Sequence, residues 1–329
     1  MRVSPWLALV WLVRVCPGVT ALARPKAARP AAKPRGTQPS RAKGFAAAPA
    51  PSPPPPPVGV VGAAAPVSTM DAHMAAVRGS VDAHAIALCE ALAADREAGF
   101  FSTEAFLGPA AVAAMLLEAR SLGATMAASH STRWDAAAGE TVTYAKVGVR
   151  ATQVLGGVEA YEATPRLVEY VVSVTAALSA ALNAGFESRR DAGAYGLPKL
   201  DAKRQTNKLA VCDEVGASYA KHVDNGGGGD PRIITVILYL SGADGGELRA
   251  FDQEPSGETL VLSPRAGTLV AFWSDGLVHD VAPLRGCDGP EGFRWALTVW
   301  LCAADLADVR PTPQQVLDRH FPDALPNST

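Results

Sequence analysis

The first 70 residues contain no aspartate or glutamate, although they carry nine lysines and arginines. The rest of the chain therefore holds 21 Lys and Arg against 32 Asp and Glu, a formal net charge of −11. Binding to nucleic acid without sequence preference depends on Lys and Arg that neutralise phosphates. An acidic domain is a poor candidate for this role, and we expect no nucleic-acid partner.

Cysteine is also scarce. The chain has five cysteines, an odd number, and no C-x-x-C motif; they are Cys16, Cys89, Cys212, Cys287 and Cys302. Their wide spacing argues against a disulfide framework and against a thiolate zinc site. We expect all but Cys16 to be small buried residues.

Residues 1–23 are typical of a secretory signal peptide. They combine the basic Arg2, a short apolar stretch that ends at Val13, and Ala21-Leu22-Ala23 as a small-x-small cleavage site. The apolar stretch is too short to cross a bilayer. We therefore expect no stable membrane span from this segment.

Residues 24–70 are dominated by Ala, Pro, Lys and Arg. This composition cannot bury a core and predicts a disordered or polyproline II segment. Basic, acid-free stretches also mark plastid transit peptides, and residues 1–70 resemble the two-part leader of algae with secondary plastids. A secreted or Golgi-resident protein with a flexible stalk is an equal alternative, so localisation stays open between the secretory pathway and a plastid.

Residues 71–329 form the predicted folded domain, and a hydrophobic content of 48% supports a real core. Capping and stop residues predict three long helices. These run from just after Ser80 to a stop at Gly99, from Pro109 to Gly123, and from Pro165 to a stop at Gly185. The sequence TPQQVLDRHF predicts a short amphipathic helix near the C-terminus.

From Lys208 the chain changes to short β-rich runs separated by Gly, Pro and Asp. The eight runs are LAVCD, SYAKHVD, IITVILYL, GELRAFD, TLVLS, GTLVAFW, VHDVAPL and RWALTVWLC. Many short strands at roughly ten-residue spacing predict a sandwich or jelly roll rather than a parallel sheet. Helices followed by strands indicate an α+β fold, a double-stranded β-helix (jelly roll) with helices packed on one sheet.

A possible metal site lies in KHVD, directly before the most strand-like segment. Residues i and i+2 of a strand face the same side, so a strand here would present His222 and Asp224 side by side. A third candidate ligand, His279, follows about 55 residues later at the start of another predicted strand. Two histidines and one carboxylate form the facial triad of non-haem iron(II) oxygenases. Each residue alone is equally consistent with an ordinary structural role.

The run FRWALTVWLC adds a buried charge. Trp295, Leu297, Val299 and Leu301 share one apolar face that should pack against the helices. Arg294 must then point into the sandwich, where a guanidinium is costly unless it is paired. No acid in the neighbouring strands is an obvious partner, so the matching carboxylate could belong to a ligand held bidentately. Tyr239 could supply a second donor to that ligand, or could be a core tyrosine.

The order of these motifs resembles the 2-oxoglutarate and iron(II)-dependent dioxygenases, and within them the prolyl 4-hydroxylases. YAKHVDN, LYL, GGELRAF, FWSD, VHDVAP and RWALTVW are most similar to the hypoxia-inducible factor prolyl hydroxylases. The resemblance covers a core of residues 205–304; before it, only the helical layout is similar.

The resemblance implies a set of site residues with no further catalytic residue. His222, Asp224 and His279 would bind iron(II). Arg294 and Tyr239 would hold the distal carboxylate of 2-oxoglutarate, with Thr298 close by. Tyr219 and Trp300 match residues that line the proline pocket; Tyr219 lies three residues before His222, so it would reach the site only through a bulge or turn.

The implied activity is a peptidyl-proline 4-hydroxylase that uses 2-oxoglutarate and O2 as co-substrates, with L-ascorbate as a further cofactor. Decarboxylation of 2-oxoglutarate to succinate would be coupled to hydroxylation of a C–H bond. The implied partner is a proline-containing protein or peptide, the implied state is a monomer, and the hypoxia branch raises an oxygen-sensing role.

The chain departs from the hypoxia group in three places. Asp213 stands where the group has a tyrosine near the co-substrate. The segment RGCDGPEG lengthens the connection between His279 and Arg294 and predicts a surface loop. The region SHSTRWDAAAGETVT replaces the group's substrate-gripping loop, with Trp134 as the one suggestive residue.

Three competing functions remain. A nucleic-acid demethylase of the same superfamily would carry a second arginine where Trp300 stands, which disfavours it. A small-molecule hydroxylase with the same triad stays open. A non-enzymatic jelly-roll binding module is the third, and it predicts that His222, Asp224, His279 and Arg294 need not converge.

Overall fold

The computed structural model describes residues 69–135, 140–191, 196–226, 229–252, 259–311 and 314–321. The side chains of residues 131–145, 314 and 317 lie outside the description. The expectations for residues 1–23 and for nearly all of 24–70 also lie outside it. A boundary at residue 71 stays a prediction.

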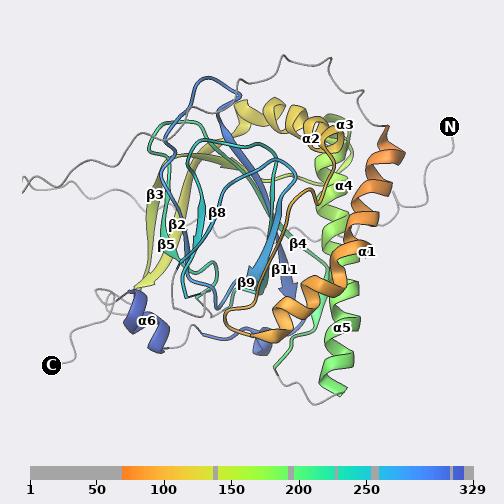
Figure 1. Cartoon of the computed structure of the whole chain (residues 1–329), viewed down its shortest axis with the longest axis vertical. Coiled ribbons are helices and arrows are strands. Elements are labelled where there is room, and N and C mark those ends of the chain that lie inside the picture. The colour runs from red at the N-terminus through yellow and green to blue at the C-terminus, as the bar shows by residue number, and fades with distance from the viewer. Residues whose placement is uncertain are drawn as a thin grey trace, which may run out of the picture. The chain divides into compact units, whose positions relative to one another are not determined.

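The helices of the described chain come mostly before the main run of strands (Figure 1). They are α1 Met70–Ala94, α2 Pro109–Ser121, η3 Leu122–Thr125, α3 Val158–Ala163, α4 Pro165–Ser173, η4 Val174–Leu178, α5 Ser179–Asp191, η5 Leu306–Asp308 and α6 Gln314–His320. The element η4 is a π-helical turn that joins α4 to α5.

The predicted helix boundaries are partly confirmed. Helix α2 begins at Pro109 behind the cap Gly108, as predicted. Helix α1 begins eleven residues earlier than expected, because Thr69 is its cap: the Thr69 hydroxyl accepts a hydrogen bond from the Ala72 N–H at 3.2 Å. Ser80 instead lies inside the helix, where its hydroxyl donates to the carbonyl of Phe106.

The stop predicted at Gly185 is wrong, since the helical segment runs on to Asp191. A Cβ atom at Gly185 would lie 2.5 Å from the Sγ atom of Cys89 in α1. The glycine therefore allows α1 and α5 to approach each other. The whole segment Pro165–Asp191 is long and apolar enough to span a membrane, with 56% of its most apolar window buried. The apolar side chains of this segment belong to the hydrophobic core, which accounts for its apolar composition.

The strands form two antiparallel sheets. They are β1 Phe100–Thr103, β2 Ala127–Asp135, β3 Glu140–Thr152, β4 Leu200–Cys212, β5 Tyr219–His222, β6 Arg232–Tyr239, β7 Leu248–Ala250, β8 Leu260–Leu262, β9 Leu269–Trp273, β10 His279–Val281 and β11 Arg294–Ala303. The larger sheet has the order β1-β9-β6-β11-β4-β3-β2 and the smaller the order β5-β10-β7-β8. The expected α+β jelly roll is confirmed, and all eight predicted strands are present.

Three strands were not expected. β1, β2 and β3 lie among the helices and extend the larger sheet at both edges. β4 also begins at Leu200, eight residues before Lys208, where the β-rich runs were predicted to begin. The predicted order of helices followed by strands therefore holds only in part. β1 and β3 pair with the later strands β9 and β4, and β2 pairs with β3.

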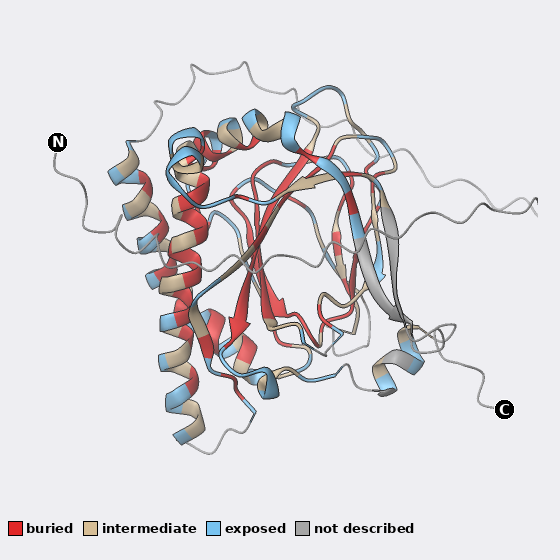
Figure 2. Ribbon diagram, turned by 180° about the vertical axis from the view of Figure 1, so that it is seen from behind, coloured by how far each residue is buried: buried red, intermediate tan, exposed pale blue. Residues whose placement is uncertain are grey.

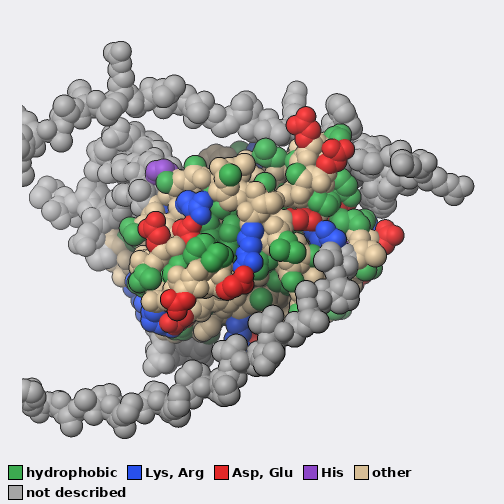
Figure 3. Space-filling view, turned by 90° about the horizontal axis from the view of Figure 1, so that it is seen from above, with side chains coloured by type: hydrophobic (Ala, Val, Ile, Leu, Met, Phe, Trp, Pro, Cys, Tyr) green, Lys and Arg blue, Asp and Glu red, His purple; other side chains and the backbone are tan. Residues whose placement is uncertain are grey.

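Helices α1, α4 and α5 form a layer over one face of the larger sheet, and α6 lies apart from them (Figures 1 and 2). Helices α4 and α5 contact β4, and the turn η4 contacts both β4 and β11. Figure 2 shows the buried residues along the inner sides of these helices and through the central strands. Trp295, Leu297, Val299 and Leu301 belong to this core, as predicted from their shared face. Figure 3 shows acidic and basic side chains mixed with apolar ones on the face seen from above.

Candidate metal centre and active site

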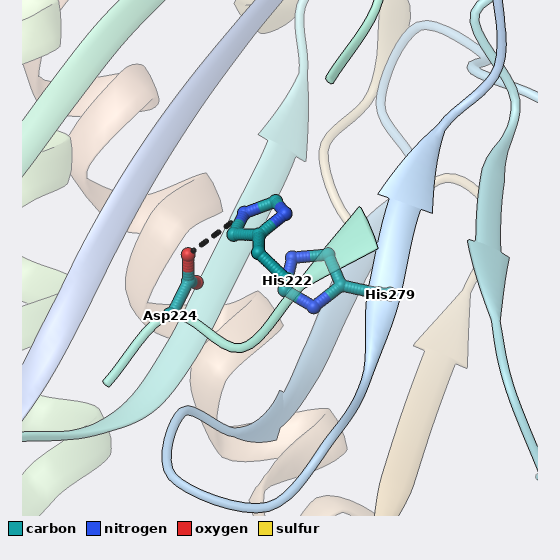
Figure 4. A group of neighbouring side chains, drawn as sticks. All are labelled: His222, Asp224 and His279. Atoms are coloured by element: carbon teal, nitrogen blue, oxygen red, sulfur yellow. Dashed lines mark ion pairs between the residues drawn. The ribbon is translucent and has the colours of Figure 1, made fainter. Parts of the chain in front are cut away.

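The smaller sheet brings the two candidate histidines together. His222 is the last residue of β5 and His279 the first of β10, and the two residues face each other as antiparallel partners. Their ring centroids are 4.4 Å apart. Asp224 follows two residues after the end of β5, and its Oδ1 atom lies 3.5 Å from Nε2 of His222 (Figure 4).

One ligand atom from each of the three residues lies within 4.8 Å of the others. The expected cluster therefore forms, but the predicted reason for it was wrong. Strand β5 ends at His222, so strand alternation does not place Asp224. Neighbouring side chains place it instead.

The Asp224 carboxylate is oriented by two donors. Its Oδ2 atom accepts hydrogen bonds from the Thr235 hydroxyl at 2.7 Å and from the Trp300 indole N–H at 3.2 Å. Oδ1 is left to face His222. Burial would raise the pKa of this carboxyl, but a hydrogen bond from His222 in its doubly protonated form, with the charges of protonated His279 and His222 and of Arg232, holds the pKa well below its usual range. Asp224 is therefore ready to act as an anionic ligand.

Backbone carbonyls set the orientation of both imidazoles. His222 Nδ1 lies 2.7 Å from the carbonyl oxygen of Ala220, and His279 Nδ1 lies 3.1 Å from that of Leu277. A carbonyl only accepts, so each Nδ1 carries the proton and each Nε2 keeps its lone pair. Such hydrogen bonds commonly fix the tautomer of metal-binding histidines. Burial, with the neighbouring His222, lowers the pKa of His279 to about 4, which keeps it neutral at physiological pH.

The cluster opens into a cavity between the two sheets. The space between its lining atoms is about 440 Å³, including its open mouth. All predicted site residues except Tyr239 line it: His222, Asp224, His279, Arg294, Thr298, Tyr219 and Trp300. Sequence-distant residues of β4, β5, β10 and β11 thus share one enclosed space.

Arg294 is buried, with 3% of its surface exposed. Its guanidinium donates to the Tyr239 hydroxyl at 3.4 Å and lies 4.0 Å from the Cys212 Sγ atom. Its Nε atom has no hydrogen-bond partner, and no carboxylate of the described residues pairs with it. A buried guanidinium without an acid is what a site for a carboxylate ligand requires.

Asp213 does not face this site. It pairs with Arg150, whose Nε donates to an Asp213 oxygen at 2.8 Å. Cys212 occupies the inward position of β4 opposite Arg294. Asp213 therefore lies away from the cavity, and Cys212 is the residue of this part of β4 that faces Arg294.

A β-bulge brings Tyr219 into the cavity. His279 pairs with His222 and Val281 pairs with Tyr219, so β5 has one residue more than β10 across the same interval. This extra residue returns Tyr219 to the face of His222, as the sequence required. Tyr219 and Trp300 both line the cavity. The side chain of Trp134 lies outside the described residues.

Two cavity residues escaped the sequence reasoning. Lys146 on β3 and Lys208 on β4 both line the space. The inward alternation of Lys208 with Ala210 and Cys212 along one strand could have revealed Lys208. No sequence signal identifies Lys146, because its strand was not predicted.

A second, larger cavity lies against α6, with about 790 Å³ between its lining atoms when its open mouth is included. Its charged groups neutralise one another, since Arg319 is 2.9 Å from Asp252 and His320 also pairs with that carboxylate. These contacts account for the docking of the predicted C-terminal helix. The expected surface loop is also confirmed, as Gly286, Asp288 and Glu291 belong to a largely exposed connection.

Two imidazole nitrogens and one carboxylate oxygen fit the facial triad that holds iron(II). Both free Nε2 atoms and the anionic Asp224 match the donor chemistry of such a site. The comparisons with known proteins bear on the same segment. Residues 207–302 match the family model described as the 2OG-Fe(II) oxygenase superfamily, a family that implies Fe(II), 2-oxoglutarate and O2.

A curated relative is the hypoxia-inducible factor prolyl hydroxylase of Caenorhabditis elegans, 38% identical over 103 residues. The match covers 30% of this chain and 13% of that protein, so the chain spans a small part of the relative's length.

Among solved structures, a Trichoplax adhaerens prolyl hydroxylase in complex with a hypoxia-inducible factor oxygen degradation domain peptide fragment is similar. Its TM-score is 0.50 at 21% identity, covering 69% of this chain and 92% of that one. A Pseudomonas putida prolyl-4-hydroxylase has a TM-score of 0.47 at 23% identity, covering 67% and 99%. The first likeness supports the shared fold.

Proposed function

We propose that this protein, whose residues 207–302 belong to the 2OG-Fe(II) oxygenase superfamily, is a 2-oxoglutarate-dependent dioxygenase that hydroxylates peptidyl proline. One observation carries the proposal. The cluster of His222, Asp224 and His279 and the buried, acid-free Arg294 lie in one cavity. This convergence removes the simplest form of the binding-module alternative.

In this proposal the metal is held by Nε2 of His222, Nε2 of His279 and an oxygen of Asp224. When bound, iron(II) with 2-oxoglutarate and O2 supplies an oxidant that hydroxylates a C–H bond, with succinate and carbon dioxide as co-products. The two backbone carbonyls keep the imidazole lone pairs directed at the metal. Thr235 and Trp300 hold the carboxylate in place.

Arg294 and Tyr239 are proposed to bind the distal carboxylate of 2-oxoglutarate. The guanidinium can donate two parallel hydrogen bonds to it, and the Tyr239 hydroxyl already lies against the same group. Thr298 lines the same cavity and lies on the same face of β11 as Arg294. Burial of all these groups excludes water from the reacting centre.

Tyr219 and Trp300 are proposed to contact the target proline. Support comes from their place in the cavity and from the similarity of 103 residues of this chain to the hypoxia-inducible factor prolyl hydroxylase of C. elegans. The T. adhaerens structure shows that a protein of this fold accommodates a peptide. L-ascorbate, a monomeric state and an oxygen-sensing role also belong to the proposal. A small-molecule hydroxylase with the same three metal ligands is the alternative function.

The test is succinate formation by the full chain with iron(II), L-ascorbate and 2-oxoglutarate, in the presence of proline-containing peptides. We expect turnover that a peptide stimulates and that His279→Ala abolishes, because the variant lacks one metal ligand. Hydroxyproline in the peptide, detected by mass spectrometry, completes the assignment.

Other outcomes separate the alternatives. Metal-dependent turnover that no peptide stimulates would favour the small-molecule hydroxylase. Absence of turnover, together with failure of 2-oxoglutarate to bind the iron-loaded protein, would contradict the enzyme proposal as a whole.

A further inference from the structure

Two lysines share one corner of the cavity with the aromatic residues proposed to contact substrate. The Nζ atom of Lys146 lies 3.9 Å from the ring centre of Tyr219. The Nζ atom of Lys208 lies 5.5 Å from the same ring and 5.6 Å from that of Trp300. Both ammonium groups thus border the space that a substrate would enter.

Neither lysine has an acidic partner among the described residues, where no ion pair within 4.0 Å joins either one to a carboxylate. Asp224 exerts an attraction on both. Its oxygens, however, are engaged by Thr235, Trp300 and His222, and its charge is assigned to the metal in the proposed function.

A further positive charge lies nearby. The Arg232 guanidinium is 4.9 Å from the centre of the Trp300 ring, although Asp230 pairs with it. Because Asp230 neutralises Arg232, the positive charge of this corner that lacks an ion-pair partner among the described residues comes from Lys146 and Lys208.

This arrangement is unfavourable without a ligand. Burial, followed by repulsion from Lys208, lowers the pKa of Lys146 to about 7, and burial also lowers the pKa of Lys208. Two like charges in a half-buried site repel each other, and an anion placed against both would relieve the repulsion. The distal carboxylate of 2-oxoglutarate does not need this pair, because Arg294 is available for it.

We propose that Lys146 and Lys208 recognise a carboxylate of the substrate, so that the preferred peptide has an aspartate or glutamate close to its target proline. The inference rests on the proposed function and specifies the substrate class of the same site. Tyr219 and Trp300 would contact the proline ring, while the two ammonium groups would bind the neighbouring acidic side chain.

The test compares matched peptides with the full-chain protein. Each peptide has one proline and either aspartate or asparagine at one of the two positions on either side of it. We expect kcat/KM to be roughly 10- to 100-fold higher for the best aspartate peptide than for its asparagine partner, as for a hydrogen bond to a charged group. Lys208→Met and Lys146→Met should each reduce this ratio.

Two further variants test whether the peptide preference depends on the charges of these two lysines: a control at an exposed lysine and a reversal of charge at Lys208. Lys203→Met removes an exposed lysine from the same strand as Lys208 and should preserve the ratio. Lys208→Glu should reverse the preference, favouring a peptide with lysine at the best position. A purely structural role for the lysines would not produce such an exchange.

Calorimetric titration of the same peptides into the protein tests the inference without turnover. If wild-type protein forms no succinate but binds the aspartate peptide more tightly than the asparagine peptide, the proposed activity fails while anion recognition stands. Equal binding and equal use of the two peptides would overturn the inference. So would Lys208→Met and Lys146→Met variants that raise the KM for 2-oxoglutarate and leave the peptide ratio unchanged.

Discussion

The two faces of strand β11 are equally buried and differ in chemistry. Trp295, Leu297, Val299 and Leu301 pack into the apolar core beneath the helices. Arg294, Ala296, Thr298 and Trp300 alternate with them and line the cavity on the other side. Every residue of the strand is buried, so burial alone does not distinguish a packing role from a functional one.

The difference lies in polar pairing. On the helix face, side chains gain by removal from water and by contact. On the cavity face, a guanidinium, a hydroxyl and an indole N–H are held where apolar residues would be more favourable. Such an arrangement is expected where a site is maintained at the expense of stability. Changes on the two faces should therefore separate stability from function.

The largest effect is expected from Arg294→Met. Loss of the proposed carboxylate anchor should raise the KM for 2-oxoglutarate by about 30-fold or more. The free energy of unfolding without ligand should stay unchanged or increase by up to a few kcal/mol, because a buried charge without an acid is removed. Steady-state kinetics and urea denaturation measure the two quantities.

Arg265→Met is the matched control, since this arginine is exposed and, among the described residues, forms an ion pair with Glu104 alone. It should change neither quantity. A large loss of stability in Arg294→Met with an unchanged KM would assign Arg294 to the core and contradict the comparison.

On the opposite face, Leu297→Ala should reduce the free energy of unfolding by about 2–5 kcal/mol, because it leaves a cavity beneath the helices. The affinity for metal should not change at temperatures where the variant is folded. Leu306→Ala, at a residue with 46% of its surface exposed, should alter stability by no more than about 0.5 kcal/mol. Weakened metal binding in Leu297→Ala would show that the two faces are coupled.

Thr235→Val probes the support of the metal ligand. The substitution keeps the shape of the side chain and removes the 2.7 Å hydrogen bond to Asp224. We expect about 10- to 100-fold weaker binding of iron(II), measured by titration under anaerobic conditions. Ser274→Ala removes the other hydrogen bond of Thr235 and should have a smaller effect. Equal affinities for all three proteins would mean that Thr235 does not position the ligand.

The smallest effect is expected in the helix layer. A methyl group at Gly185 would press on Cys89, so Gly185→Ala should destabilise the fold by about 1–3 kcal/mol, less the gain in helix propensity. Gly79→Ala, where no atom lies within 4 Å, should stabilise the fold by about 0.5–1 kcal/mol. Thermal denaturation of both variants gives the comparison, and Cys89→Ala should suppress the Gly185→Ala defect. If both Gly185→Ala and Gly79→Ala stabilise the fold, the close contact between α1 and α5 at Gly185 is refuted.

Much of the fold could be predicted because its signals are local. Pro109 behind Gly108 favours the start of a helix, and the alternation in RWALTVWLC separates the two faces of β11 without further context. The misplaced start of α1 and the false stop at Gly185 share one cause. Serine and glycine serve equally as helix termini and as interior residues, and only the contacts with Phe106 and Cys89 decide between these uses.

The sequence by itself determined which residue types are available for chemistry: two histidines, an aspartate and an arginine on predicted β segments. Their proximity was decided by the pairing of β5 with β10, which joins residues about 55 positions apart. The tertiary structure likewise decided three further features: the bulge beside Tyr219, the inward position of Cys212, and the place of Lys146 in the lining of the cavity. Register and sheet-edge pairing depend on contacts between distant segments, and no local pattern encodes such contacts.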